Sequence, residues 1–326
     1  IESEDKFIKF LILNIYKDMP KSYLENFDKI RKKISPLAKQ KKIIFSMHSI
    51  VINDNFKIYM AETKKIGSRF IFVQHGGALS YTQDPFFNFI ERISDKIITW
   101  GVKKNEQNIY NHLSPTLPTI KLKKFKEGNN CSIIFIECLK YLRRFNVGPT
   151  FEQTDNFFKE IQQFVNTLLP EIRSKVKFRV KINHGINSEK KFSEMFGNNS
   201  IDKVSYKNPF EKTIINSKLV IVTYPETAFA EAMYSNVPTI LIIKKNSWPL
   251  SLESKNIFDI LKKNKIAFED FNEAKIHINE YWKKLDIWWK SKNVQSAREI
   301  FLKNFFNVKP NWYKDWSNYI SFSKDL

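Results

Sequence analysis

The sequence is poor in glycine and cysteine, and it has no long apolar run. Only 8 of its 326 residues are glycine, and Cys131 and Cys138 are the only cysteines. The spacing of these cysteines matches no zinc or redox motif, so we expect two reduced thiols in the core of a cytoplasmic protein. No apolar run approaches the ~18–20 residues of a membrane-spanning helix. The sequence therefore predicts no such helix.

Several catalytic motifs are absent as well. The sequence has no Gly-x-x-x-x-Gly-Lys phosphate loop, no His-Glu-x-x-His zinc helix and no Gly-x-Ser-x-Gly nucleophile elbow. Kinase, metalloprotease and esterase functions therefore have no support in the sequence.

Acidic residues are too few to balance the basic ones. Lysine and arginine number 54 against 34 aspartates and glutamates, for a net charge of +20. This excess predicts attraction to polyanions: nucleic acid, an anionic bilayer surface or a phosphorylated substrate. The basic residues are dispersed and no nucleic-acid-binding motif accompanies them, so we expect no nucleic-acid partner. A basic face at a membrane or around a phosphorylated donor fits better, and the alternative is lysines spread over solvated helix faces.

Two of the rare glycines are adjacent in Gln74-His75-Gly76-Gly77. The preceding run, Arg69 to Val73, has the aromatic and β-branched residues of a buried strand. A strand that ends in this way brings an imidazole to the carboxyl edge of a sheet, beside backbone that a ligand can approach closely. The motif predicts a binding or catalytic site, and the alternative is an ordinary strand-to-helix loop.

Strand and helix patterns alternate in two blocks along the chain. The first block has strands at 42–46, 70–74 and 96–99, and the second has strands at 132–136, 176–182, 219–223 and 239–243. A stretch without periodicity, 111–130, separates the two blocks. We predict an α/β fold with two Rossmann-like domains that face each other across a cleft. The boundaries are 1–120 for an acceptor-side domain, 121–290 for a donor-binding domain and 291–326 for C-terminal helices that pack back.

A second motif follows the strand at 219–223. Glu226 and Thr227 are expected at a helix N-terminus, where free N–H groups suit a phosphate and Thr227 can cap the helix. Glu231 lies one turn further along the same face, where its carboxylate can accept hydrogen bonds from sugar hydroxyls. The alternative is a simple cap and a solvated carboxylate.

Together these motifs resemble the nucleotide-sugar half of two-domain GT-B glycosyltransferases. They resemble more closely a bacterial family of surface-carbohydrate transferases that is distantly related to CDP-glycerol glycerophosphotransferases. The matching residues occur in order between about 40 and 305: Ala61-Glu62, Gly67, Gln74 to Gly77, Glu91, Ser94-Asp95, Thr99 to Gly101, Tyr141 to Arg144, Arg179, Thr227, Glu231, Pro238 to Ile240, Trp288-Trp289, Gln295, Ala297-Arg298 and Phe301.

The resemblance implies a glycosyltransferase that uses a CMP-, CDP- or UDP-linked donor and no further cofactor. Its acceptor would be a surface polysaccharide or lipooligosaccharide, reached from the cytoplasm at the inner face of the membrane. A CDP-polyol phosphotransferase on the same fold is the alternative, and a non-catalytic binder of polyanions or nucleic acid is the alternative of another class. The sequence contains no Asp-x-Asp, which favours metal-independent stabilisation of the leaving group.

The same resemblance suggests roles for individual residues. His75 is the candidate base or phosphate-stabilising cation, and Glu91 or Asp95 would orient it or act as the base. For these two carboxylates the alternative is a helix-end charge and a cap. The candidate donor-binding residues are Gly76, Gly77, Arg144, Lys181, His184, Glu226, Thr227 and Glu231. Arg144 and Lys181 would neutralise donor phosphates.

Overall fold

The structure is a computed structural model that describes residues 4–39, 41–77, 82–83, 85–101, 108–112, 114, 128–136, 151–181, 187–205, 207–244, 247–309 and 311–322. Cys138, Arg144, His184 and the predicted domain boundary at 120/121 lie outside these ranges. The chain divides into two compact units, Ile1–Val73 with Ile93–Lys96, and Gln74–Arg92 with Ile97–Leu326.

The first unit is mainly helical. Its elements are α1 (Lys6–Asp18), α2 (Lys21–Leu24), α3 (Phe27–Ile34), a 3-10 turn (Ser35–Leu37), β1 (Ile43–Ser46), α4 (Ser49–Ile52), α5 (Asp54–Lys65) and β2 (Arg69–Val73). α2 and α3 are separate helices, because the chain turns at Glu25 and Asn26. An ion pair of 2.8 Å between Arg31 Nε and Glu62 Oε1 joins α3 to α5.

Four strands form the first sheet, in the order β1-β2-β3-β4. β3 is Lys96–Thr99 and β4 is Ile109–Asn111, and α7 (Pro85–Ile93) precedes β3. β1 pairs with β2 in parallel, and so does β3 with β4. β4 has only three residues, two of them exposed, so its sequence carried no strand signal.

The second sheet lies wholly in the second unit. Its strands are β5 (Asn130–Ile136), β6 (Val176–Lys181), β7 (Ser217–Val222), β8 (Thr239–Ile242) and β9 (Ala267–Phe268). Their order is β6-β5-β7-β8-β9, and each neighbouring pair is parallel. When the strands are numbered within this sheet, the order is the 2-1-3-4-5 of a doubly wound sheet, whose switch point lies between β5 and β7. The predicted α/β class with parallel sheets is confirmed.

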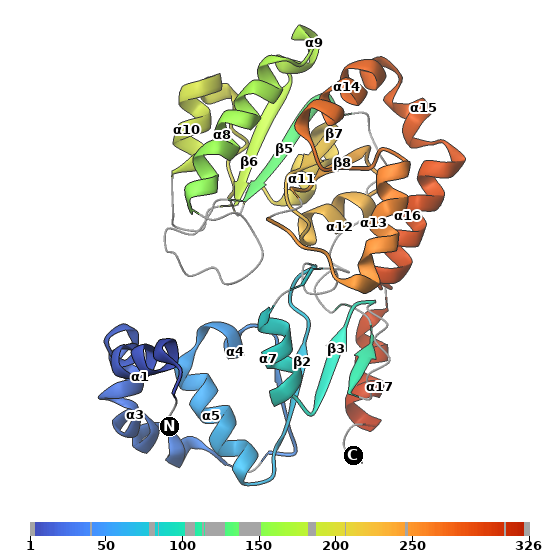
Figure 1. Cartoon of the computed structure of the whole chain (residues 1–326). Helices are drawn as coiled ribbons and strands as arrows, with labels where there is room; N and C mark the ends of the chain where they lie inside the picture. The colour runs from blue at the N-terminus through green and yellow to red at the C-terminus, as the bar shows by residue number, and fades with distance from the viewer. Residues whose placement is uncertain are drawn as a thin grey trace. The chain divides into compact units, whose positions relative to one another are not determined.

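Helices accompany these strands. They are α8 (Phe151–Asn166), α9 (Pro170–Arg173), α10 (Ser188–Phe196), α11 (Phe210–Asn216), α12 (Thr227–Tyr234), α13 (Leu252–Lys263), α14 (Phe271–Tyr281), α15 (Leu285–Trp289), α16 (Lys292–Phe305) and α17 (Trp312–Phe322), as Figure 1 shows. None of the helices in the described ranges has the length and hydrophobicity needed to cross a lipid bilayer.

Aromatic side chains fill the core between the second sheet and its helices. Phe192 of α10 stacks on Phe178 of β6 at 4.2 Å between ring centroids, and it meets Phe135 of β5 edge-on at 5.2 Å. All three rings are buried. Cys131 is buried in the same core, and burial raises the pKa of its thiol to about 12. The thiol is therefore protonated at neutral pH, as expected of a core cysteine.

The C-terminal segment contacts residues that follow β3 and β4. Asn307 donates its N–H to the carbonyl of Trp100 at 2.7 Å, and Ser114 donates to the carbonyl of Asn307 at 3.0 Å. The Trp316 ring of α17 lies 5.0 Å from the His112 ring, just after β4. These contacts all lie within the second unit, beside α16 and α17 (Figure 1).

His277 is a buried histidine with an aromatic environment. Its ring lies 4.7 Å from Tyr281, 4.8 Å from Trp288 and 5.7 Å from Phe268. Burial, and to a smaller extent the charge of Lys265, lowers the pKa of His277 to about 4. The folded protein therefore holds this imidazole neutral at pH values where an unfolded chain protonates it.

We predict that His277→Phe reduces the acid sensitivity of the fold. The unfolded histidine has a pKa near 6.5, so the neutral ring stabilises the fold fully above about pH 6.5. This stability is lost as the pH falls toward 4, by at most about 3 kcal/mol. Urea unfolding at about pH 7.5 and about pH 4.5 measures the loss. The exposed His48 provides the control variant His48→Phe. Equal pH dependence in His277→Phe and the natural protein would contradict the prediction.

Candidate functional site

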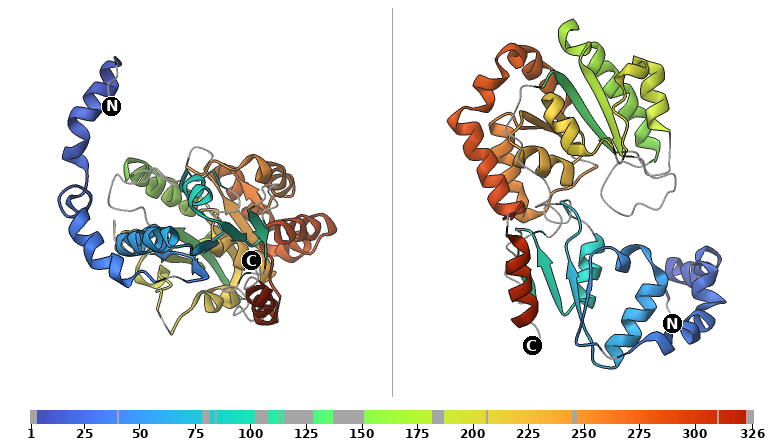
Figure 2. Two further views of the ribbon diagram at one scale, coloured as in Figure 1. Left: turned by 90° about the horizontal axis from the view of Figure 1, so that it is seen from below. Right: turned by 180° about the vertical axis from the view of Figure 1, so that it is seen from behind.

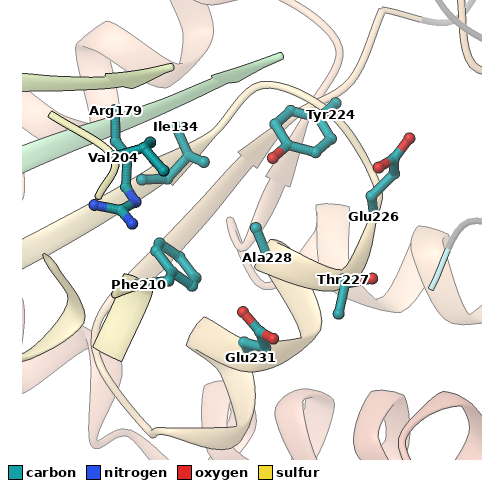
Figure 3. A pocket seen from close by; sticks show the side chains of 9 residues that line it. All are labelled: Ile134, Arg179, Val204, Phe210, Tyr224, Glu226, Thr227, Ala228 and Glu231. Atoms are coloured by element: carbon teal, nitrogen blue, oxygen red, sulfur yellow. The ribbon is translucent and has the colours of Figure 1, made fainter. Parts of the chain in front are cut away.

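The second unit has a pocket at the carboxyl ends of its parallel strands. The pocket has a volume of about 410 Å³. Figure 3 shows the nine residues that line it: Ile134, Arg179, Val204, Phe210, Tyr224, Glu226, Thr227, Ala228 and Glu231. Ile134 lies on β5, and residues 224–228 follow β7, so the pocket lies beside the switch point of the sheet. In doubly wound sheets this crevice is the usual ligand site.

The turn between β7 and α12, together with the helix itself, brings three predicted residues to the pocket: Glu226, Thr227 and Glu231. Thr223, directly after β7, is fixed by donating its N–H and its hydroxyl to the carbonyl of Ile134, at 3.1 and 3.0 Å. Glu226 is the N-cap residue of α12, and its side chain makes no capping hydrogen bond. Thr227 is therefore the first helical residue instead of the expected cap. Its hydroxyl is available for another contact.

That contact is with the glycine pair. Gly77 donates its N–H to Thr227 Oγ1 at 3.1 Å, and a Cβ on Gly76 would lie only 3.3 Å from the same oxygen. The backbone of residues 76 and 77 thus lies against the N-terminus of α12, where a larger residue at 76 would force Thr227 to move. The structure therefore brings Gly76, Gly77, Thr227, Glu226 and Glu231 together.

Gln74 holds the start of the glycine motif in place. Its backbone N–H donates to the carbonyl of Ile98 at 2.8 Å, and its buried side chain accepts the N–H of Trp100 at 2.9 Å. The side-chain amide also donates to the carbonyl of Gly76 at 2.8 Å. Between these fixed points, the side chain of His75 is exposed. It therefore lies on a rigid turn with access to solvent.

Arg179 is a pocket residue that we did not select as a site residue from the sequence. It is buried, and its Nη2 donates to the carbonyl of Asn208 at 2.9 Å. Nη1 is also buried; among the described residues it has no hydrogen-bond acceptor, and Asp202 Oδ2 lies 3.6 Å away. The charge of Asp202 offsets part of the desolvation of this guanidinium, but a buried N–H without a hydrogen-bond acceptor remains unusual.

A signal for Arg179 was present in the sequence. On the strand Val176–Lys181, arginine at 179 alternates with the apolar residues Phe178 and Val180. The alternation alone predicts a solvated face. The face is instead covered at Arg179, where the ring of Phe210 lies 5.8 Å from the guanidinium carbon. The lysines at 177 and 181 share the alternation of Arg179. The burial of Arg179 therefore follows from the position of α11 and the loop before it, which the sequence pattern does not give.

Tyr224 contributes a buried phenol to the pocket. Burial raises its pKa well above the usual value, and the charges of Glu226 and Glu231 raise it further, against a smaller opposing effect of Arg179. The hydroxyl therefore stays protonated across the physiological range, where it can donate a hydrogen bond. The pocket thus combines a cation, two carboxylates and a neutral phenol with the apolar surfaces of Ile134, Val204 and Phe210.

Asp95 and Glu91 lie elsewhere. Asp95 Oδ2 accepts from the N–H of Phe70 at 2.6 Å and from Lys64 Nζ at 2.9 Å. These contacts tie Asp95 to the start of β2, whereas His75 follows the end of that strand, so the structure does not bring these two side chains together. Glu91 is half-buried on α7. Neither carboxylate lines the pocket.

The remaining predicted residues are described partly or not at all. Lys181 ends β6, where it is paired with Ile136 of β5, and its side chain is outside the described part of the structure. Arg144 and His184 also lie outside it. In the described ranges, no group of three or more histidine, cysteine, aspartate or glutamate side chains is arranged to hold a metal ion.

The C-terminal helices anchor the far end of α12. Arg298 of α16 donates from Nε to the carbonyl of Met233 at 2.5 Å and from Nη2 to that of Tyr234 at 3.1 Å. Trp289 donates its indole N–H to both oxygens of Asn236, which has the positive φ of 57° typical of a residue just past a helix end. A cation at this end also suits the helix dipole.

Comparison with known proteins assigns the chain to a family. Residues 1–320 match the model of the LIC12162 family of transferases. The chain belongs to this family. The family confirms the transferase relationship that the sequence motifs predicted. A search of curated protein sequences finds no match.

Solved structures include distant neighbours of this transferase. Two are structures of the wall teichoic acid polymerase TagF. One of them, a variant soaked with CDPG, has 10% identity, a TM-score of 0.48 and coverage of 87% of this chain and 73% of that chain. The other has 12% identity, a TM-score of 0.42 and coverage of 87% and 74%. MurG of Acinetobacter baumannii has 10% identity, a TM-score of 0.45 and coverage of 91% and 76%. Because all three TM-scores are below 0.5, these similarities establish neither activity nor substrate.

We predict that Arg298→Met destabilises the transferase by roughly 1–3 kcal/mol. The variant removes the charge-assisted hydrogen bonds to the carbonyls of Met233 and Tyr234, and only that of Met233 keeps a backbone donor, the N–H of Asn236. Urea unfolding measures the free energy, and Lys303→Met, on an exposed position of the same helix, is the matched control. Equal stability of the two variants would show that Arg298 does not hold α12.

Proposed function

We propose that this transferase moves a glycosyl group from a CMP-, CDP- or UDP-linked donor to a surface polysaccharide or lipooligosaccharide acceptor. The reaction takes place in the cytoplasm, at the inner face of the membrane, and needs no metal. The observation that carries the proposal is the buried Arg179 guanidinium, whose Nη1 has no hydrogen-bond acceptor among the described residues and lies in the wall of the pocket.

The donor phosphate is the ligand that completes the hydrogen bonding of Arg179. A guanidinium binds phosphate oxygens through charge-assisted hydrogen bonds that are stronger than those to neutral acceptors. In a buried pocket the attraction is screened less than in water. The carbonyl of Asn208 accepts from Nη2, and Asp202 Oδ2 lies 3.6 Å from Nη1, so the guanidinium keeps one orientation before the donor arrives. Arg144, Lys181 and His184 remain further candidates for contact with the phosphates.

The N-terminus of α12 supports the same binding mode. The first N–H groups of a helix have no partner within the helix, and they favour an anion. Glu231 and Glu226 are too negative to bind phosphate themselves, and their carboxylates instead accept hydrogen bonds from the hydroxyls of ribose or sugar. The neutral phenol of Tyr224 donates to an uncharged oxygen of the donor. The apolar side chains of Ile134, Val204 and Phe210 cover the base or the apolar face of the sugar.

His75 is the proposed general base. It follows Gln74 on a fixed turn, two residues before Gly77, whose N–H is bonded to a residue of the pocket wall. An exposed imidazole in this position deprotonates the acceptor hydroxyl as that oxygen attacks the anomeric carbon of the donor. The bond from this carbon to the phosphate oxygen breaks, and the leaving nucleotide takes the negative charge. Arg179 and the N–H groups of α12 stabilise this charge without a metal.

We predict that pyrimidine nucleotides stabilise the protein through Arg179. A ligand at 100 times its dissociation constant adds about 2.7 kcal/mol to the stability. Melting temperatures measured across CMP, CDP and UDP should rise to saturation, with DNA and RNA oligonucleotides showing no such rise. Arg179→Met should bind nucleotides at least tenfold more weakly than the natural protein, and Arg179→Lys should keep part of the affinity. Each variant's melting shift is measured against the same variant without nucleotide.

The exposed Arg173 gives the matched control variant Arg173→Met, which keeps the natural affinity. Saturation by nucleic acid instead of nucleotides would favour a polyanion-binding protein. A donor panel separates the two transferase types: release of CMP together with transfer of a polyol phosphate would make the protein a phosphotransferase. Equal nucleotide affinity of the Arg179→Met and Arg173→Met variants would overturn the assigned donor site.

We predict that His75→Ala lowers the transfer rate about 10²–10⁴-fold, the usual contribution of a general base. Because the side chain is exposed, the fold and the nucleotide-dependent melting shift should be unchanged. Single-turnover kinetics with a radiolabelled donor measures the rate, and His48→Ala is the control for loss of an exposed histidine. An unchanged rate in His75→Ala would remove this residue from the mechanism.

A further inference from the structure

Helix α1 exposes almost all of its large apolar side chains. Phe7 is 65% exposed, Phe10 60% and Leu13 68%. Ile8, Leu11, Ile12, Ile15 and Tyr16 are also exposed, and no residue of the helix is buried. Figure 2 (left) shows α1, in dark blue, extending beyond the other helices of the first unit. Contiguous apolar surface of this kind usually marks an interaction site.

The sequence nevertheless specifies a helix here. Asp5 caps the N-terminus by accepting the N–H groups of Phe7 and Ile8, at 2.7 and 3.1 Å, and Lys17 lies in the last turn. No glycine or proline interrupts the 13 residues. A helix this short is only marginally stable in water by itself, so contact with a partner would stabilise it.

The side chains of α1 divide into two faces. At about 100° per residue, Ile8, Leu11, Ile12 and Ile15 share one side of the helix. Lys6, Lys9 and Lys17 fall within roughly 80° of each other on the opposite side. The helix is therefore amphipathic: its lysines gather opposite the four aliphatic residues, with Phe10 and Leu13 among them. This is the pattern of helices that lie in the plane of a membrane interface.

The segment around α1 has the charge that an anionic surface attracts. Residues 4–39 contain nine basic and five acidic side chains. Eight of the basic ones are exposed lysines: Lys6, Lys9, Lys17, Lys21, Lys29, Lys32, Lys33 and Lys39. A second copy of the helix packed on the apolar side would leave these lysines in solvent, without a counter-charge from it. A bilayer with anionic headgroups instead complements both the lysines and the apolar side.

We propose that α1 binds the surface of an anionic lipid bilayer. Ile8, Leu11, Ile12 and Ile15 enter the boundary between headgroups and acyl chains, and the lysines contact lipid phosphates. Phe10 and Leu13, which lie near the lysines, also reach apolar lipid, because lysine side chains extend past them to the headgroups. The helix thereby holds the protein at the membrane, independently of the pocket in the second unit.

Vesicle co-sedimentation of the full chain tests the proposal. Vesicles of phosphatidylcholine with phosphatidylglycerol should pellet the protein, and vesicles of phosphatidylcholine alone should pellet at least tenfold less. The double variant Leu11→Glu/Ile15→Glu should bind at least tenfold more weakly, because two carboxylates replace the apolar side. The triple variant Lys6→Gln/Lys9→Gln/Lys17→Gln should lose the preference for phosphatidylglycerol.

A matched control is Ile287→Glu, since this isoleucine is 72% exposed on α15, in the second unit. It should bind vesicles as the natural chain does, and the melting temperatures of all variants report that they fold. Equal binding by Ile287→Glu and the double variant would overturn the proposal. Failure of the natural chain to bind anionic vesicles would also overturn it. So would light scattering that shows a dimer in solution which the Leu11→Glu/Ile15→Glu variant no longer forms.

Discussion

Helix α12 is held at both ends, and the pocket depends on this. At its N-terminus Thr227 accepts the N–H of Gly77, and at its C-terminus Arg298 and Trp289 bind the last carbonyls and Asn236. The two anchors come from segments about 150 residues before the helix and about 60 after it. A helix fixed in this way holds the carboxylate of Glu231 and the N–H groups of Thr227 and Ala228 in a constant position. Such rigidity supports a preorganised binding site.

The positive and negative side chains of the pocket lie on different structural elements. Arg179 lies on β6 while Glu226 and Glu231 lie on α12 and the turn before it, and Figure 3 shows the arginine and Glu231 on different sides of the pocket. A donor that has phosphates at one end and hydroxyls at the other complements this arrangement. The buried Tyr224 stays neutral between the two signs. The transferase relationship rests on the family assignment, and the proposed donor site rests on this geometry.

The sequence located the main elements because their patterns are local. The strands β2 (Arg69–Val73) and β7 (Ser217–Val222) each contain a run of apolar residues, and α12 begins at the threonine of a Pro-Glu-Thr sequence. The short strands Ile109–Asn111 and Ala267–Phe268 escaped prediction because they are too short for a periodic signal. For Asp95 the motif predicted the position but not the contacts. The residue precedes a strand as expected, yet its carboxylate accepts hydrogen bonds from Lys64 and from the N–H of Phe70.

By itself, the sequence determined the α/β class, the adjacent glycines at the end of β2 and the helix N-terminus at Thr227. Periodicity and the backbone preferences of glycine and proline act between near neighbours in the chain. Only the tertiary structure showed that Arg179 is buried in the pocket wall, since its burial depends on Phe210 and Asn208, about 30 residues away. It likewise joined Gly77 to Thr227, because a hydrogen bond between segments 150 residues apart leaves no local trace in either one.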